Sequence, residues 1–341
     1  MEWNFATKLL QKISEFISKK SPSLPLPLWE LKKVFINQKG VIVLAIVLYV
    51  AISSAFQYRY LIPTYTDVEE TYYIKYSGEI NAKLHEDMTM EYEKLHEIYD
   101  ILDEVYWSRL ELFGFSDELE ELYEKLQDME YKLTVLEMLI YKVENGLEYT
   151  SKTGITIQLI KSGLYELLLL NDTATTNKNA LYIMIAMVGI FAGICANEHH
   201  YNMCSTLKTS LKGRGKLTAI KLSIIAFMSI ILTLTIYAPQ ILLIGIEGYN
   251  DLDAMAQSLA FLRFVPFPVT ILGYLILMFV IRIIATFIVG MIVMLISKYC
   301  HNSITAVCIS ATIIIIPAVL SGTEVLPIPT IADLIGYCVI K

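Results

Sequence analysis

The sequence predicts an all-α integral membrane protein with about five transmembrane helices and a large extracellular helical hairpin, a coiled coil, between the first and second. Of the 341 residues, 55% are hydrophobic and 18% are charged, whereas soluble globular proteins average about 25% charged residues. Five long stretches carry at most one charge, and one segment repeats apolar residues in steps of three and four. This composition argues against a water-soluble enzyme.

The charges are divided unevenly along the chain. Residues 61–178 contain 25 Asp and Glu against 10 Lys and Arg, a net charge of −15. The remaining residues contain 9 acids and 17 bases, a net charge of +8. No domain-sized basic surface exists, so no nucleic-acid partner is expected. The separation instead predicts a chain divided by a lipid bilayer.

The N-terminal residues 1–39 are expected to form cytoplasmic, interfacial amphipathic helices. Within 1–20 the apolar residues fall near one face with lysines among them, a pattern typical of a helix in the membrane interface. A soluble docking helix is the alternative. The proline-rich residues 21–28 are expected to exclude regular helix. A second short interfacial helix then covers 29–37, where Trp29 suits the headgroup level.

The uncharged stretches are long enough to cross a bilayer, which takes about 20 apolar residues in a helix. They place the first transmembrane helix at 40–60, the second at 179–197, and the third to fifth within 222–323. The tail, 324–341, has too few apolar residues for another span. It is expected to be a re-entrant element or a truncated sixth helix.

The lysines and arginines of short loops predict the orientation. Residues 1–39 hold seven Lys, and residues 198–221 hold four Lys and one Arg against one acid. Both segments, including the N-terminus, are therefore expected in the cytoplasm. The acidic segment 61–178 is expected outside, and it contains no cysteine, so disulfides do not hold it together.

The acidic segment shows a heptad pattern. Steps of three and four link Leu119, Leu122, Leu126, Met129, Leu133, Leu136, Ile140 and Val143, which predicts a coiled-coil helix. Ser116 is a suitable N-cap, and Asn145-Gly146 a suitable stop. A looser stripe precedes it, formed by Leu84, Met88, Tyr92, Leu95, Ile98, Leu102 and Val105. The two helices are expected to pair with each other, or with those of a second subunit. Residues 154–170 form a third amphipathic stretch.

Motifs for catalysis and metal binding are missing. The sequence has no GxxxxGK[ST] phosphate-binding loop and no HExxH zinc motif. His199, His200 and Cys204 are capable of binding a metal, but ordinary polar residues at a membrane boundary are the simpler interpretation. No catalytic residue, metal site or cofactor of its own is predicted.

Arg282 interrupts an otherwise uncharged stretch, 264–297. Charges inside a membrane are costly and suggest a functional role, here in a substrate path. The alternative is that the span starts near residue 277, which leaves Arg282 close to the outer interface, where its side chain snorkels.

Residues 191–221 carry a recognisable pattern. A Phe and a Glu end the second span, and a T-S-x-x-G-R-x-x-L-x-x-x-K segment enters the third. These positions are Phe191, Glu198, Thr209, Ser210, Gly213, Arg214, Leu217 and Lys221. Together with the order of the elements, the tyrosine-rich residues 72–76, the triplet 257–259 and Pro317, this resembles the permease subunit of a type-2 ATP-binding-cassette (ABC) transporter of Gram-positive bacteria.

The resemblance implies a mechanism and partners. Two permease subunits, as a homodimer or heterodimer, would bind two ABC ATPase subunits, and those partners would bind the ATP. Residues 198–214 would be the coupling segment, with Glu198, Thr209, Ser210, Gly213, Arg214 and Lys221 coupling to the ATPase. The assembly would export a hydrophobic or peptide-like substrate across the bacterial plasma membrane. The family has six spans, whereas five are counted here.

Two other interpretations stay open. The cations of 198–221 could serve only to orient the chain, and Glu198 could simply mark the membrane interface. The whole protein could then be a non-transporting membrane protein whose extracellular coiled coil binds a partner or senses an envelope signal.

Overall fold

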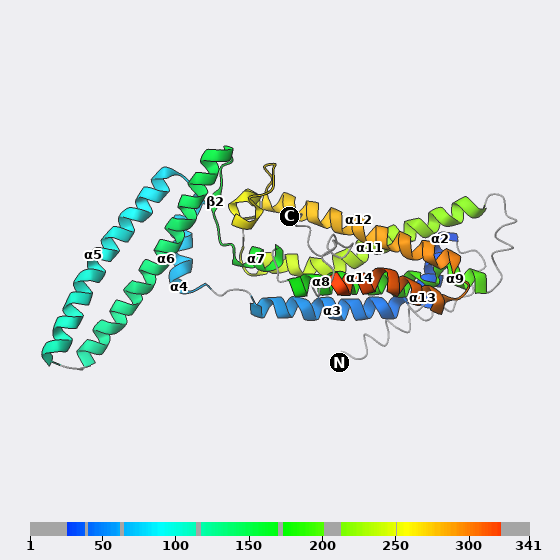
Figure 1. The fold of residues 1–341 in the computed structure, drawn as a ribbon, viewed down its shortest axis with the longest axis horizontal. Coiled ribbons are helices and arrows are strands. Elements are labelled where there is room, and N and C mark those ends of the chain that lie inside the picture. Colours follow the sequence, from blue (N-terminus) through cyan, green and yellow to red (C-terminus); the bar gives the residue numbers. More distant parts are fainter. Residues whose placement is uncertain are drawn as a thin grey trace, which may run out of the picture. The chain divides into compact units, whose positions relative to one another are not determined.

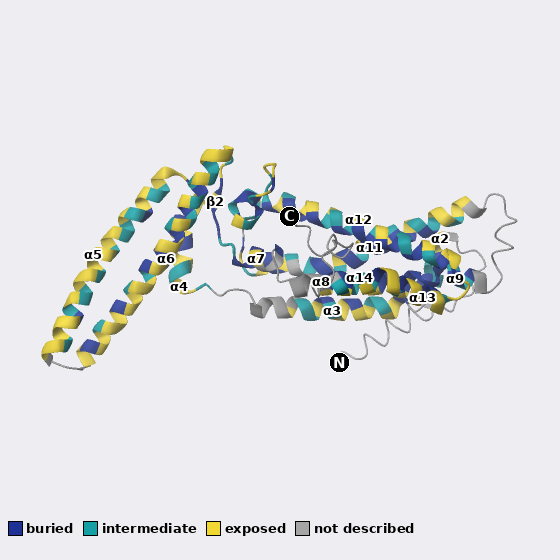
Figure 2. Cartoon of the chain, viewed as in Figure 1, coloured by how far each residue is buried: buried dark blue, intermediate teal, exposed yellow. Residues whose placement is uncertain are grey.

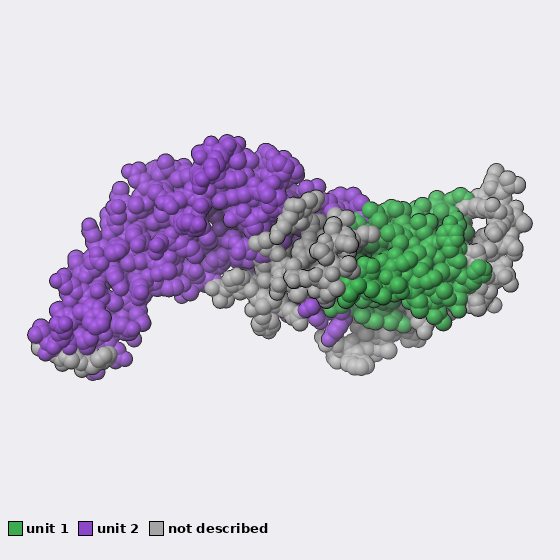
Figure 3. Space-filling model, viewed as in Figure 1, with its two compact units in different colours: residues 1–48, 181–232, 285–328 green, residues 49–180, 233–284, 329–341 purple. Residues whose placement is uncertain are grey.

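The computed structural model describes residues 26–37, 40–61, 65–113, 117–169, 173–200, 213–249 and 251–321. These residues are almost entirely helical (Figure 1). The chain divides into two compact units (Figure 3), one made of residues 1–48, 181–232 and 285–328, the other of 49–180, 233–284 and 329–341. Both the amphipathic segment expected at 1–20 and the tail 324–341 lie outside the described residues.

Four described stretches are long and apolar enough to cross a membrane as helices. They are Lys178–Glu198, Gly215–Ile246, Ile271–Tyr299 and Ser303–Leu320. A shorter apolar stretch, Gly40–Ser54, belongs to helix α3, Gly40–Leu61. The chain is thus compatible with an all-α, multi-pass membrane protein, and the count of five spans stays a prediction.

The first unit combines helical segments that are distant in sequence. Its described elements are α2 (Leu26–Lys32), the π-helix η1 (Lys33–Asn37), parts of α3, α8 (Thr173–Phe191), α11 (Gly213–Ile246) and α12 (Ile271–Tyr299), together with α9 (Gly193–His200), α13 (Ser303–Ser310), η5 (Ala311–Ile315) and α14 (Ile316–Ser321). The expected helix at 29–37 begins earlier than predicted, at Leu26. Pro27 fits there because the first turn of a helix does not need its N–H. Helix α11 also starts before the uncharged run, at Gly213.

The second unit contains the acidic segment. Its described elements include α4 (Asp67–Tyr76), β1 (Gly78–Glu79), α5 (Ala82–Phe113), α6 (Asp117–Thr153), β2 (Gln158–Leu159), α7 (Gly163–Leu169) and three short 3-10 helices, η2 (Asp251–Asp253), η3 (Ala256–Ser258) and η4 (Ala260–Leu262). The two strands pair antiparallel, with Gly78 opposite Leu159. Residues 154–170, expected as one amphipathic stretch, therefore divide into a strand and a short helix.

Helices α5 and α6 run antiparallel and pack against each other (Figure 1). Five of the expected heptad positions of α6 are buried, namely Leu119, Leu126, Leu133, Leu136 and Val143. Val135 and Leu139 are buried as well, because α4 packs against this part of α6 and widens its buried face. In α5 the stripe shifts by one residue: Ile98 is exposed, while Tyr99 packs in the core near the tip.

The predicted helix stop at Asn145-Gly146 is wrong. Helix α6 continues to Thr153 and ends before Gly154, whose φ of 71° suits a residue without a side chain. Gly146 is buried inside the helix. A Cβ atom on Gly146 would lie 2.7 Å from Ile80 Cδ1 and 3.1 Å from Ile157 Cδ1. This glycine therefore allows the residues that flank β1 and β2 to approach the helix closely.

Candidate functional site at a buried ion cluster

Four charged side chains meet inside the first unit: Glu30, Lys33, Glu198 and Lys221, called the ion cluster below. Lys33 Nζ lies 2.8 Å from Glu198 Oε1, and Lys221 Nζ lies 2.7 Å from Glu198 Oε2. Lys33 Nζ is also 3.8 Å from Glu30 Oε2. Two acids and two bases make the cluster formally neutral. Its ion pairs join three helical segments, namely α2–η1, α9 and α11.

The ion cluster is well shielded from solvent. Glu30 is 1% exposed, Lys221 4% and Glu198 8%. Both lysines also donate to the Ile194 carbonyl oxygen, at 3.4 Å from Lys33 and 3.3 Å from Lys221. Each lysine therefore holds α9 at two points, its backbone and its Glu198 side chain.

Within the ion cluster, the Glu30 carboxylate has the weakest pairing with a cation. Burial raises the pKa of its carboxyl group, and the nearby Lys33 and Lys221 ammonium groups oppose that rise. Lys33 reaches it only at 3.8 Å, farther than a hydrogen-bonded pair. The position of α2 therefore depends on the lysines that Glu198 also binds.

A hydroxyl group fixes the other end of α9. Ser297 Oγ, on α12, donates to the Ala192 carbonyl oxygen at 2.6 Å and accepts from the Cys195 and Ala196 N–H groups at 3.0 Å each. Ala192 lies between the end of α8 and the start of α9, where backbone groups lack regular helical partners. Ser297, which is fully buried, satisfies these groups and ties α9 to α12.

A buried ion pair is not in itself a source of stability, since desolvation offsets much of the attraction. Removing one partner of such a pair is costly, however, by about 3–5 kcal/mol. The ion cluster and Ser297 therefore make α9 a segment that does not separate easily from α2, α11 and α12.

The sequence-predicted site residues have different outcomes. Glu198 and Lys221 are brought into direct contact. Gly213 and Arg214 lie in the first turn of α11, and for these two residues only the backbone is described. Thr209 and Ser210 lie outside the described residues, as does Cys204. Whether any of them couples to an ATPase stays a prediction.

Three members of this site were not found from the sequence: Glu30, Lys33 and Ser297. Glu30 and Lys33 have the i, i+3 spacing of a helical ion pair, which was the only local signal. Ser297 ends an uncharged run and resembles any other small polar residue there. Their contacts depend on segments more than 100 residues away, which no local pattern specifies.

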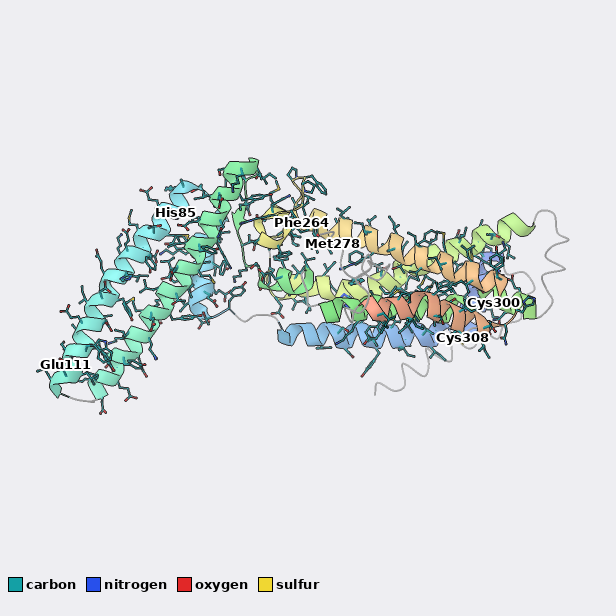
Figure 4. All side chains as sticks on the ribbon, viewed as in Figure 1. His85, Glu111, Phe264, Met278, Cys300 and Cys308 are labelled. Carbon is teal, nitrogen blue, oxygen red and sulfur yellow. The ribbon has the colours of Figure 1, made fainter. Side chains whose placement is uncertain are left out.

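Arg282 belongs to the second unit and is 7% exposed. Its guanidinium carbon lies 3.9 Å from the centre of the Tyr237 ring, a favourable cation–π distance. The two residues line a recess together with Leu169, Ile241, Leu275, Met278 and Phe279. Figure 4 labels Met278 on α12. Arg282 is thus covered by protein, which differs from the snorkelling side chain considered above.

The other motifs of the resemblance have structural roles. Phe191 is fully buried at the end of α8, and Tyr72, Tyr73 and Tyr76 belong to the core between α4 and α6. The Gln257 amide nitrogen donates to the Val265 and Phe267 carbonyl oxygens, at 3.3 and 2.7 Å. These contacts hold the fold, so they do not by themselves indicate a function.

The described residues contain no group of three or more His, Cys, Asp or Glu side chains placed to hold a metal ion. Comparisons of the chain with protein-family models, with curated proteins and with solved structures find no match in any of the three.

Proposed function

We propose that the chain is the membrane-spanning permease subunit of a type-2 ABC transporter in a bacterial plasma membrane. A separate ATPase subunit would bind ATP, and a second permease subunit would complete the assembly. The role proposed for the complex, export of a hydrophobic or peptide-like substrate, follows from the resemblance. The observation that carries the proposal is the ion cluster, because it joins the two helices that flank the expected coupling segment.

The geometry suits a coupling device. Glu198 precedes residues 201–212, and Lys221 follows them in α11, so their 2.7 Å contact closes the base of this segment. Lys33 connects the base to α2, and Ser297 connects α9 to α12. A force that an ATPase applies to the segment would therefore move α9, α11 and α2 together. Lys208, Lys212 and Arg214 of the segment would provide the positive charge for contacts with carboxylates of such a partner.

The first test is co-purification. The full chain, extracted from its native host in mild detergent, should recover an ATPase subunit with a phosphate-binding loop. Arg214→Ala should weaken this recovery, whereas Lys298→Ala, an exposed cation at the end of α12, serves as the matched control. If wild-type protein recovers no ATPase, the permease proposal fails and the partner-binding or sensor alternative gains support.

A second test separates assembly from coupling. Glu198→Gln keeps the shape of the side chain but removes its charge, so the ATPase should stay bound while substrate-stimulated ATP hydrolysis falls. Unchanged stimulation in this variant would show that the ion cluster has only a structural role.

A further inference from the structure

Helix α6 has a second pattern besides its heptad seam. Between residues 119 and 146, all exposed side chains without a charge lie in one stripe: Tyr123, Gln127, Tyr131, Thr134, Met138 and Tyr141. The steps of four and three keep these residues on one side of the helix. The other exposed residues of this stretch are all charged: Glu120, Glu121, Glu124, Lys125, Asp128, Glu130, Glu137 and Glu144. Solvation alone does not require this sorting, although Tyr131 also has a partner within the protein, the Thr66 hydroxyl 2.8 Å away.

The stripe exposes large side chains. Tyr141 is 66% exposed, Tyr123 43%, Tyr131 38% and Met138 37%. The seam residues Leu119, Leu126 and Leu133 lie on the neighbouring side of the helix and are buried. Tyrosine and methionine are enriched at protein interfaces, and an exposed patch with a polar rim indicates a binding surface. The exposed residues along α6 are visible in Figure 2.

Aromatic residues of α5 continue the stripe near the hairpin tip. The Tyr106 ring lies 5.6 Å from that of Tyr123 and 5.4 Å from that of Trp107, centre to centre. Trp107 is 55% exposed. Figure 4 labels Glu111 close to this end of the hairpin and His85 at the opposite end of α5. The stripe therefore ends in a cluster of three rings.

Charge decides what can bind there. Helices α5 and α6 contain 19 acidic and 7 basic residues, a net charge of −12. A second copy of the hairpin would be repelled, as would anionic lipid headgroups. Glu124, Glu130 and Glu137 border the stripe, and none of them forms an ion pair among the described residues. A cation placed there would gain charge-assisted hydrogen bonds and cation–π contacts.

We propose that the stripe from Tyr123 to Tyr141 binds a cationic amphipathic polypeptide segment. The apolar face of the segment covers Met138 and the tyrosine rings, and its lysines or arginines reach the bordering glutamates. The stripe is about 27 Å long, at 1.5 Å per residue, which matches a helix of about 18 residues. This inference does not depend on an ATPase partner.

The probe is a fluorescent 18-residue amphipathic helix of Lys and Leu, titrated with the full chain in neutral detergent and followed by anisotropy. Tyr123→Ser with Tyr141→Ser should weaken binding at least tenfold. The matched control is Ile101→Ser with Leu112→Ser, exposed apolar residues of α5, which should change Kd less than twofold. A Glu and Leu peptide of the same pattern should not bind. Circular dichroism of each variant checks that the hairpin is folded.

Several results would overturn the proposal. Equal weakening by both variant pairs would show unspecific apolar binding, and no effect of the tyrosine pair would exclude the stripe. Binding of the acidic peptide would refute the charge argument. Efficient disulfide linkage of two copies through Met138→Cys would assign the surface to a second copy instead.

Discussion

Lys33 and Glu198 lie 165 residues apart in the sequence, and their Nζ and Oε1 atoms lie 2.8 Å apart in the structure. The contact joins a short helix that precedes the first apolar helix to the end of the α8–α9 segment. Lys221 approaches the same carboxylate from α11. Glu198 is therefore the residue on which three parts of the chain converge.

Removing one lysine from the ion cluster should destabilise the protein. Lys221→Ala leaves the buried Glu198 with a single cation, so the free energy of unfolding should fall by about 3 kcal/mol. Thermal unfolding in detergent measures the change. The exposed Lys216→Ala on the same helix should stay within about 0.5 kcal/mol of wild type. Equal melting of the two variants would refute the pairing.

Ser297→Ala should also lower stability. It leaves one carbonyl oxygen and two N–H groups at the α8–α9 junction without their partner, and each unsatisfied buried group costs about 1–3 kcal/mol. The control is Ser223→Ala, whose hydroxyl is exposed and donates only to Ala219 within its own helix. That variant should melt as wild type does. A Ser297→Ala protein with unchanged melting would contradict the assigned role.

Gly290→Ala tests the packing of the apolar helices. An added Cβ would lie 2.4 Å from both Ile225 Cγ2 and Met187 Cε. The Met187 side chain can move, but β-branched Ile225 is stiff in a helix. Overpacking costs about 1–3 kcal/mol, which exceeds the gain of about 1 kcal/mol in helix propensity. Gly245→Ala, with open space around it, should be neutral or stabilising. Thermal unfolding of both variants makes the comparison. Stabilisation by Gly290→Ala would show that α12 packs less closely against α8 and α11 than the structure indicates.

Acid should weaken the second unit partly through Glu91. Burial opposes ionisation of this carboxyl, but hydrogen bonds from Lys75 and Tyr76 lower its pKa below the usual 4.5. The stabilisation is therefore present above about pH 4.5 and is lost as the pH falls through the lowered pKa of the folded state. Glu91→Gln should make the loss of helical circular dichroism signal between pH 5 and about pH 3 shallower. The exposed Glu93→Gln on the same helix should follow wild type.

The apolar helices and the helical character of α5 and α6 could be predicted from sequence because their signals are local. An uncharged run or a heptad repeat records which side of a helix avoids water. The same patterns misplaced the end of α6. Gly146 does not end the helix, but allows Ile80 and Ile157 to approach it closely. Likewise, Tyr99 replaces Ile98 in the seam because the partner helix determines which residues are covered.

The candidate site could be predicted only in part. Glu198 and Lys221 stood out because they belong to the motif of residues 191–221, at the ends of two apolar runs. Glu30, Lys33 and Ser297 did not, because their importance arises from contacts over long sequence distances. The side-chain positions of a buried polar network depend on the assembled fold rather than on any window of the sequence.

The two kinds of contact also differ in when they can form during synthesis. The α5–α6 hairpin joins neighbouring segments, so it can close once Thr153 has been synthesised. Glu198 can bind both of its lysines only after α11 has been made and placed beside α9. Formation of this contact thus marks the correct assembly of the helices on either side, and a chain that fails to make it leaves the Glu198 carboxylate without its cations.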